Sequence, residues 1–193
     1  MCMEIRSTDG GGAVPNISFN LTGDIAYFAT TETRPRVWAC NINDIMPRDC
    51  TDDVSSGGAR YWRSPELASG VNTVARTPDA LVAFGYKAAY FLNYSTGELI
   101  TPAASPIVPE GDLYFVAALG GADGSTYLLA VKPGEYGVKQ IIIFDKPNQL
   151  VVDFRSRGNG YFVDIDSSGR AWLLAHDLIP MQTAAEYRAR LLR

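Results

Sequence analysis

The sequence predicts an all-β chain, and three observations support this fold class. Short stretches of Val, Ile, Tyr, Phe and Leu recur along the chain, and Gly, Pro, Asn or Asp interrupts them about every tenth residue. The chain has 193 residues, with 47% apolar and 20% charged side chains, which is the composition of a globular protein. Helical spacing of apolar residues occurs only at the carboxyl terminus. We therefore expect short antiparallel strands around a packed core.

Four segments share one layout, in which a polar turn leads into an apolar strand, at residues 20–28, 76–84, 108–116 and 155–163. Their turn positions lie on average about 45 residues apart, which is close to the length of one four-stranded repeat unit, and are Asp24, Asp79, Asp112 and Asn159. A second apolar strand follows each segment, at residues 36–40, 88–92, 126–131 and 170–175. The predicted building unit is therefore a hairpin.

The most complete of these repeats predicts four strands within about thirty residues, at 71–76, 81–84, 88–93 and 98–101. It serves as the template for the others. We expect a single domain over residues 1–193, because the length matches one typical domain. The template divides this domain into modules at approximately 16–70, 71–104, 105–149 and 150–178.

Two passages of the chain resemble blades of β-propeller proteins. Residues 88–100 contain the strand, Ser/Thr-Gly turn and strand passage of quinoprotein-like and WD-type blades, and residues 162–172 are similar to NHL-type blades. The resemblance implies a small propeller-like array of about four antiparallel modules, and it brings no catalytic residue with it. A β-sandwich or barrel is the alternative, because these folds also give alternating strands and turns.

Both ends of the chain carry further predictions. The fourth module lacks an outer strand, and the residues near Met3 to Arg6 are spare, so an exchange between the two ends would close the array and remove open sheet edges. At the carboxyl terminus, Pro180 is a favourable first helical residue, and apolar residues follow at helical spacing. We expect a short amphipathic helix over residues 180–193.

The charge and apolar content of the chain disfavour two classes of partner. Seventeen basic and twenty-one acidic residues give a formal net charge of −4, which opposes binding to nucleic acids and to acidic membrane surfaces. No apolar run approaches the roughly 20 residues that cross a bilayer. We expect a soluble protein with neither a nucleic-acid nor a membrane partner.

The cysteines predict a reducing environment. Cys2, Cys40 and Cys50 are odd in number and form no Cys-x-x-Cys pair, so we expect neither a disulfide framework nor a zinc site. The amino terminus has no apolar stretch of the kind found in signal peptides. Together these features predict a cytoplasmic location.

Residues suited to catalysis are scarce, and we expect no catalytic residue, no metal and no cofactor. His176 is the sole histidine, and no nucleophile elbow or phosphate-binding glycine loop is present. Converging carboxylates leave an aspartate-based hydrolase as an alternative, with Asp24, Asp79 and Asp112 as the candidates. Because these aspartates recur at equivalent turns, a structural role at the turn is the favoured interpretation.

The candidate binding residues lie in loops. Residues 41–70 form the longest segment with little strand pattern, and this segment contains Tyr61, Trp62 and Arg63, which are the residue types most enriched at binding hot spots. The alternative is that Trp62 covers the core beneath its own loop. In a propeller, one rim would also group Glu32, Arg34, Tyr86, Lys87 and Asp123.

This rim mixes charged and aromatic side chains, which suits a protein partner. The sequence therefore predicts a non-enzymatic protein–protein interaction module, such as an inhibitor, an immunity-type protein or a scaffold. A propeller that binds a small ligand or a glycan is the alternative. The sequence makes no prediction of oligomeric state.

Overall fold

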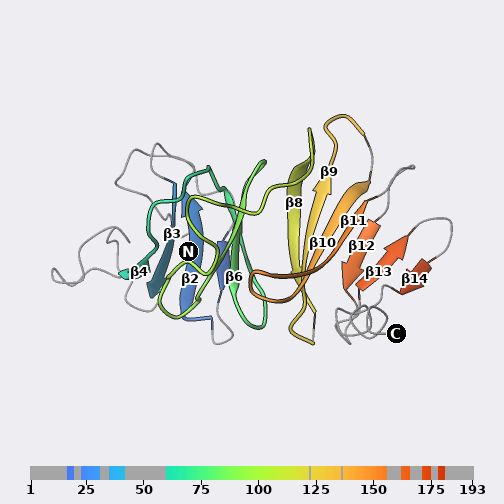
Figure 1. The fold of residues 1–193 in the computed structure, drawn as a ribbon. Helices are drawn as coiled ribbons and strands as arrows, with labels where there is room; N and C mark the ends of the chain where they lie inside the picture. The colour runs from blue at the N-terminus through green and yellow to red at the C-terminus, as the bar shows by residue number, and fades with distance from the viewer. Residues whose placement is uncertain are drawn as a thin grey trace. The chain divides into compact units, whose positions relative to one another are not determined.

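The structure is a computed structural model, which describes residues 17–19, 23–30, 35–41, 60–121, 123–135, 137–155, 162–165, 171–174 and 178–180. Every helix or strand assigned within these residues is a β-strand, so the all-β prediction is confirmed. The strands form four separate antiparallel sheets, and none of these sheets closes into a barrel (Figure 1). No helix capable of crossing a membrane occurs in the described part of the chain.

The chain divides into two compact units. The first comprises Met1–Arg76 and Leu81–Ile107, and the second comprises Thr77–Ala80 and Val108–Arg193. Each unit contains two of the four sheets.

The first sheet of the first unit has the strand order β1-β2-β3-β4, with β1 at Ile17–Phe19, β2 at Ile25–Thr30, β3 at Arg36–Asn41 and β4 at Arg60–Arg63. Side chains alternate between its two faces, because successive strand residues point in opposite directions. Tyr27 and Ala29 belong to one buried cluster, whereas Phe28 and Trp38 belong to another. Phe28 and Trp38 lie directly opposite each other in the β2–β3 register.

The second sheet of the first unit contains β5 (Thr73–Arg76), β6 (Leu81–Phe84) and β7 (Ala89–Leu92), in that order. Every residue of β6 and β7 is buried. The strand predicted at 98–101 does not form, and a single bridge joins Leu92 to Leu99. The Thr101 hydroxyl, and not a backbone carbonyl, accepts the Phe91 N–H at 2.9 Å, so a regular ladder cannot continue there.

These two sheets share one apolar core. The cluster takes Tyr27, Val37 and Trp62 from the first sheet and Leu81 and Tyr90 from the second, all with less than a tenth of their surface exposed. Burial of each large side chain contributes about 1.5–3 kcal/mol, so this shared core dominates the stability of the first unit.

The second unit contains a four-stranded sheet in the order β11-β10-β9-β8, with β8 at Tyr114–Gly120, β9 at Thr126–Val131, β10 at Val138–Lys146 and β11 at Gln149–Arg155. The predicted module boundary at 149/150 falls inside this sheet, because β11 pairs with β10. Asn148 has φ of 60° in the intervening turn, and a left-handed residue of this kind permits a tight hairpin.

The second sheet of this unit joins β12 (Phe162–Ile165), β13 (Ala171–Leu174) and β14 (Leu178–Pro180). Pro180 lies opposite Trp172 as the last residue of β14, so the residue predicted to begin a helix belongs to a strand. Proline is tolerated at an edge strand as well as in a first helical turn, which is why the local signal misled. The rest of the predicted helix, and the amino-terminal segment expected to complete the fourth module, lie outside the described residues.

The four predicted hairpins correspond to β2–β3, β6–β7, β8–β9 and β12–β13. Their position within the sheets differs, however. In the first unit a strand precedes the hairpin in its sheet, whereas in the second unit the hairpin opens the sheet. The sequence pattern therefore repeats in hairpins, and hairpin signals alone do not reveal which strand of a sheet comes first.

Candidate functional site

The segment that joins β4 to β5, residues 64–72, is held by both sheets of the first unit, and we call it the connector. The backbone N–H groups of Ser64 and Leu67 bond to the first sheet and to the residue just before its strand β3, whereas those of Ser69 and Asn72 bond to the second sheet. The side chains of Leu67 and Val71 are buried in the shared core. The connector is thus an ordered part of the surface, although it contains no strand.

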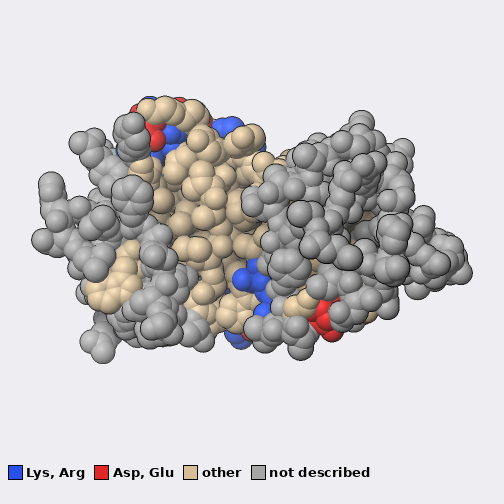
Figure 2. Space-filling view, turned by 180° about the vertical axis from the view of Figure 1, so that it is seen from behind, with Lys and Arg blue, Asp and Glu red and all other residues tan. Residues whose placement is uncertain are grey.

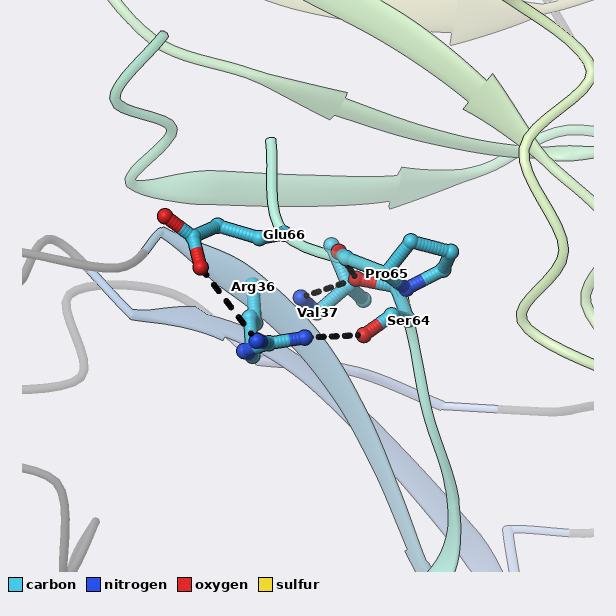
Figure 3. Close-up of polar contacts among 5 residues, drawn as sticks. All are labelled: Arg36, Val37, Ser64, Pro65 and Glu66. Carbon is cyan, nitrogen blue, oxygen red and sulfur yellow. Dashed lines mark hydrogen bonds and ion pairs between the residues drawn. The ribbon is translucent and has the colours of Figure 1, made fainter. Parts of the chain in front are cut away.

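A polar clamp fixes the start of the connector against β3 (Figure 3). Arg36 lies between the two residues that it binds: one guanidinium nitrogen donates to the Ser64 carbonyl oxygen at 3.0 Å, and another pairs with the Glu66 carboxylate at 3.4 Å. The Arg36 side chain is only 17% exposed, which limits the solvent screening of this pair.

The Ser64 hydroxyl both accepts and donates a hydrogen bond at this clamp. It accepts the Val37 N–H at 2.9 Å and donates to the Pro65 carbonyl oxygen at 2.8 Å, and the residue is 1% exposed. A buried hydroxyl with both roles taken does not act as a nucleophile, so Ser64 is a structural residue.

The structure places Trp62 in the core, as the alternative interpretation expected, and not on a contact surface. Trp62 is 8% exposed, and its ring centroid lies 5.8 Å from that of Tyr27. Its Nε1–H donates to the Tyr94 carbonyl oxygen at 3.0 Å. A Cβ atom at Gly97 would overlap the Trp62 ring, so a glycine there lets the chain pack against the indole. Because so little of the ring is exposed, we do not include Trp62 among the proposed contacts.

The other two residues of the Tyr-Trp-Arg passage belong to the same strand. Arg63 is exposed on the sheet face opposite to that of Trp62, and its guanidinium carbon lies 5.3 Å from the centroid of the Trp38 ring. The backbone of Tyr61 lies in β4, and its side chain is outside the described part of the chain.

Tyr86 and Lys87 form the exposed tip of the β6–β7 hairpin. Tyr86 is 65% exposed, and Lys87 is exposed beside it. The backbone of Gly85 lies so close to that of Gly70 that a side chain at position 85 would overlap the Gly70 carbonyl oxygen. This contact brings the hairpin tip next to the end of the connector.

We call the surface made by the connector and this hairpin tip the rim. Its exposed residues are Pro65, Glu66, Ala68, Gly70, Tyr86 and Lys87. The sequence predicted Tyr86 and Lys87 as rim residues together with the loop 41–70, but within that loop it singled out Tyr61, Trp62 and Arg63 and not residues 65–70. Their position depends on the contact between two glycine backbones, which leaves no recognisable motif.

The remaining predicted contacts are distributed differently. Glu32 and Arg34 lie outside the described residues. Asp123 belongs to the second unit, in the turn between β8 and β9, where its carboxylate accepts the Ser125 N–H at 3.0 Å. This bond is the turn-stabilising role that short polar side chains commonly play.

The aspartates considered for hydrolysis lie next to the strands that they were predicted to precede. In the turn Thr77–Ala80, however, Thr77 and not Asp79 makes the stabilising bonds, because its N–H and its hydroxyl both donate to the Ala80 carbonyl oxygen at 2.9 Å. No group of three or more His, Cys, Asp or Glu side chains suited to a metal ion occurs where the structure describes the chain.

A carboxylate pair that the sequence did not suggest lies in the second unit. Arg155 binds Glu110 at 2.5 Å and Asp153 at 3.0 Å, and the buried Gln140 amide donates to Asp153 at 2.8 Å. Hydrogen bonding to Asp153 is the main cause of the raised pKa of Arg155. The two carboxylates are therefore bound to one guanidinium group. Glu110 lies far from Asp153 and Arg155 in sequence, so no spacing rule could have found this group.

Charged side chains on the described surface form small groups. Figure 2 shows Lys and Arg in separate patches with uncharged residues between them. Nucleic-acid binding relies on several cations aligned along a phosphate backbone. The absence of a nucleic-acid partner stays a prediction from the net charge of −4.

The structure corrects the expectation for the cysteines. Cys40 is fully buried, packs with Phe28 and Trp38, and is disulfide-bonded. Disulfides persist chiefly in oxidising compartments. This bond removes the premise on which a reducing, cytoplasmic environment was predicted.

Comparison with known proteins bears on the fold alone. No family model and no curated protein matches the sequence. Among solved structures, the crystal structure of the computationally designed Ika4 protein is similar, with a TM-score of 0.59 and 14% sequence identity over 95% of this chain and 99% of that chain. At this identity the similarity describes the path of the backbone and carries no statement about activity.

Proposed function

We propose that this chain is a non-enzymatic protein-interaction module, of the inhibitor, immunity or scaffold type, and that it binds its partner through the rim. The observation that carries this proposal is the 65% exposure of Tyr86 at the tip of a hairpin whose two strands are fully buried. Exposed tyrosines on rigid supports are typical anchors of protein interfaces, because they bury a large area and lose little entropy.

The surroundings of Tyr86 support the same function. Lys87 and Glu66 supply charges of opposite sign on the rim, and the connector, which carries Glu66, is tied to both sheets. An ordered surface loses little conformational freedom on binding, which leaves more of the contact energy for affinity. A polar margin around an aromatic anchor is also the usual composition of a transient interface.

Catalysis receives less support from the same residues. The Ser64 hydroxyl has both hydrogen-bonding roles filled, and Glu110 and Asp153 bind one guanidinium. The Ser64 hydroxyl is therefore a structural group, and both carboxylates are engaged by Arg155. The proposal therefore requires neither a reaction nor a cofactor.

We propose further that the four sheets are the modules of a propeller-like array. Each sheet joins strands that are consecutive in the chain, and no strand crosses over to another sheet, as expected for repeated blades. A crystal structure in which the four sheets surround a common axis is the expected result. Two pairs of sheets packed face to face as a sandwich would refute this arrangement.

The interaction proposal is tested with a photo-crosslinking amino acid at position 86 of the full chain, incubated with lysate of the native organism. Position 150 is the matched control, because Leu150 is 56% exposed but lies in the second unit. We expect a crosslinked partner at position 86 and none at position 150. Recovery of that partner should fall with Tyr86→Ala and stay unchanged with Leu150→Ala. Equal recovery by both variants would contradict binding through the rim.

A further inference from the structure

Arg63 is an exposed arginine that is held in place by an aromatic ring. It lies directly opposite Trp38 in the β3–β4 register, with its guanidinium carbon 5.3 Å from the ring centroid. Trp38 is 1% exposed, so the ring forms a fixed platform. A cation–π contact with a buried indole limits the conformations of the arginine.

Within the described residues, no hydrogen-bond partner is found for the donors of Arg63 and Trp38. The guanidinium groups of two other described arginines, Arg36 and Arg155, bind carboxylates. For Arg63, the described part of the chain provides the ring contact and no hydrogen bond or ion pair. The Nε1–H of Trp38 is also buried without an acceptor. Buried donors without acceptors are rare in native proteins and call for an explanation.

The chemistry of the Arg63 donors fits a carboxylate. A guanidinium presents two parallel N–H groups that match the two oxygens of a carboxylate, and such paired, charge-assisted bonds are strong. On the face drawn in Figure 2 the cations lie in small groups, whereas a polyanionic nucleic acid needs several aligned cations. One such arginine is enough to bind a single Asp or Glu side chain on a protein surface.

We propose that Arg63, positioned by Trp38, is the residue that recognises a carboxylate on an acidic segment of a protein partner. This assignment rests on the proposed interaction function and names the chemistry of its partner. Arg63 immediately precedes the connector in the sequence, and a partner that covers both the rim and this end of β4 would contact it.

The direct test uses the full chain labelled with nitrogen-15 and an acetylated Glu-Ala-Glu-Ala-Glu peptide as the probe. We expect the Arg63 Nε–H and Trp38 Nε1–H resonances to shift and saturate with this peptide, but not with its Gln analogue. Absent shifts, or equal shifts with the Gln analogue, would overturn the assignment. An equal, saturating response to a single-stranded oligonucleotide of the same charge would show general anion binding and overturn the choice of a protein carboxylate.

Variants separate the guanidinium geometry from the simple charge. Arg63→Lys keeps the charge but lacks the planar fork, so we expect binding of the acidic peptide to weaken about tenfold. Arg63→Ala should abolish the saturating shift of Trp38 while the rest of the spectrum stays unchanged, which also shows that the variant is folded. Lys146→Ala is the matched control, because Lys146 is an exposed cation of the second unit. Equal weakening by Lys146→Ala would refute a specific role for Arg63.

The two proposals fail in different ways. If the partner crosslinked at position 86 binds Arg63→Ala as tightly as the unmodified chain, the rim function stands and the carboxylate assignment falls. If the acidic peptide binds at Arg63 but no partner depends on Tyr86, the arginine site stands and the rim function falls.

Discussion

The indole Nε1–H of Trp62 donates to the carbonyl oxygen of Tyr94 at 3.0 Å, and this bond joins the last strand of the first sheet to the turn that follows β7. The two residues are 32 positions apart in sequence, and both sheets of the first unit depend on the packing around the Trp62 ring. This contact therefore connects the two sheets and contributes to the stability of the first unit.

Replacement of Trp62 is expected to destabilise the first unit. Trp62→Ala removes a large buried side chain and should lower the free energy of unfolding by about 3–5 kcal/mol. Trp62→Phe keeps an aromatic ring but removes the bond to Tyr94, for which we expect a loss of about 1–3 kcal/mol. Urea unfolding monitored by circular dichroism measures both. A Trp62→Ala variant as stable as the unmodified chain would contradict a core role for this ring.

A side chain at position 97 should destabilise the first unit. Gly97 has φ of 73°, and a Cβ atom there would overlap the Trp62 ring, so Gly97→Ala should lower the free energy of unfolding by about 1–3 kcal/mol. Gly134 is the matched control, because its φ is 75° and nothing lies within 4 Å of the added Cβ. Gly134→Ala should lower it by about 1 kcal/mol, from backbone strain alone. Equal losses in thermal or chemical unfolding would argue against the ring contact.

The Ser64 hydroxyl is expected to matter for stability even though the residue lies in a connector. Ser64→Ala leaves the buried Val37 N–H without its acceptor, which should lower the free energy of unfolding by about 1–3 kcal/mol. Ser105 is a matched control, since it is an exposed serine that also precedes a proline. Its replacement by Ala should change stability by less than about 0.5 kcal/mol. Comparable effects at the two sites would show that the clamp contributes little.

The exposed ion pairs of the β9–β10 turn predict a measurable shift in titration. Hydrogen bonds from Lys132 and Lys139 lower the pKa of Glu135 below its ordinary value, and the Lys132 pKa is raised by its bond to Glu135. Because the folded-state pKa of Glu135 is depressed, its contribution to stability is present above the unfolded pKa and is lost as the pH falls through the folded pKa.

Carboxyl carbon NMR across an acidic titration measures this pKa directly. Lys132→Ala should move the Glu135 midpoint upward, and Lys139→Ala should do the same. Lys146→Ala, which removes a cation elsewhere in the second unit, should leave it unchanged. A midpoint unaffected by loss of either ion-pair partner would contradict the contacts in this turn.

The disulfide at Cys40 predicts the thiol content of the protein. The chain has three cysteines, so a denatured but unreduced sample should react with maleimide at one thiol, and a reduced sample at three. Cys40→Ala should lower the free energy of unfolding by about 2–5 kcal/mol, because it removes the cross-link and a buried side chain. Mass spectrometry of protein purified from its native source measures the thiol count. Three reactive thiols without reduction would restore the prediction of a reducing environment.

Most of the strand positions could be predicted from the sequence, because apolar alternation and turn residues are local signals. The strands at 25–30, 81–84 and 126–131 lie where these signals placed them. Local signals failed where one sequence pattern is compatible with two kinds of secondary structure. Pro180 suits both a first helical turn and an edge strand, and residues 98–101 alternate like a strand although a Thr101 side chain interrupts the ladder.

The candidate site was predicted only in part, for a related reason. Tyr86 and Lys87 were identified because a turn between two apolar strands must be exposed. Trp62 was ambiguous, since the same residue type anchors cores and interfaces, and only its neighbours Tyr27 and Tyr94 decide between the two roles.

By itself, the sequence determined the all-β class, the four hairpins and the exposed turn residues, since these depend on the alternation of neighbouring side chains. Only the tertiary structure decided that Trp62 is buried, that Arg63 stacks on Trp38, and that the connector lies beside Tyr86. These outcomes depend on contacts between residues about 15 to 35 positions apart, which packing and hydrogen bonding select and which no short stretch of sequence encodes.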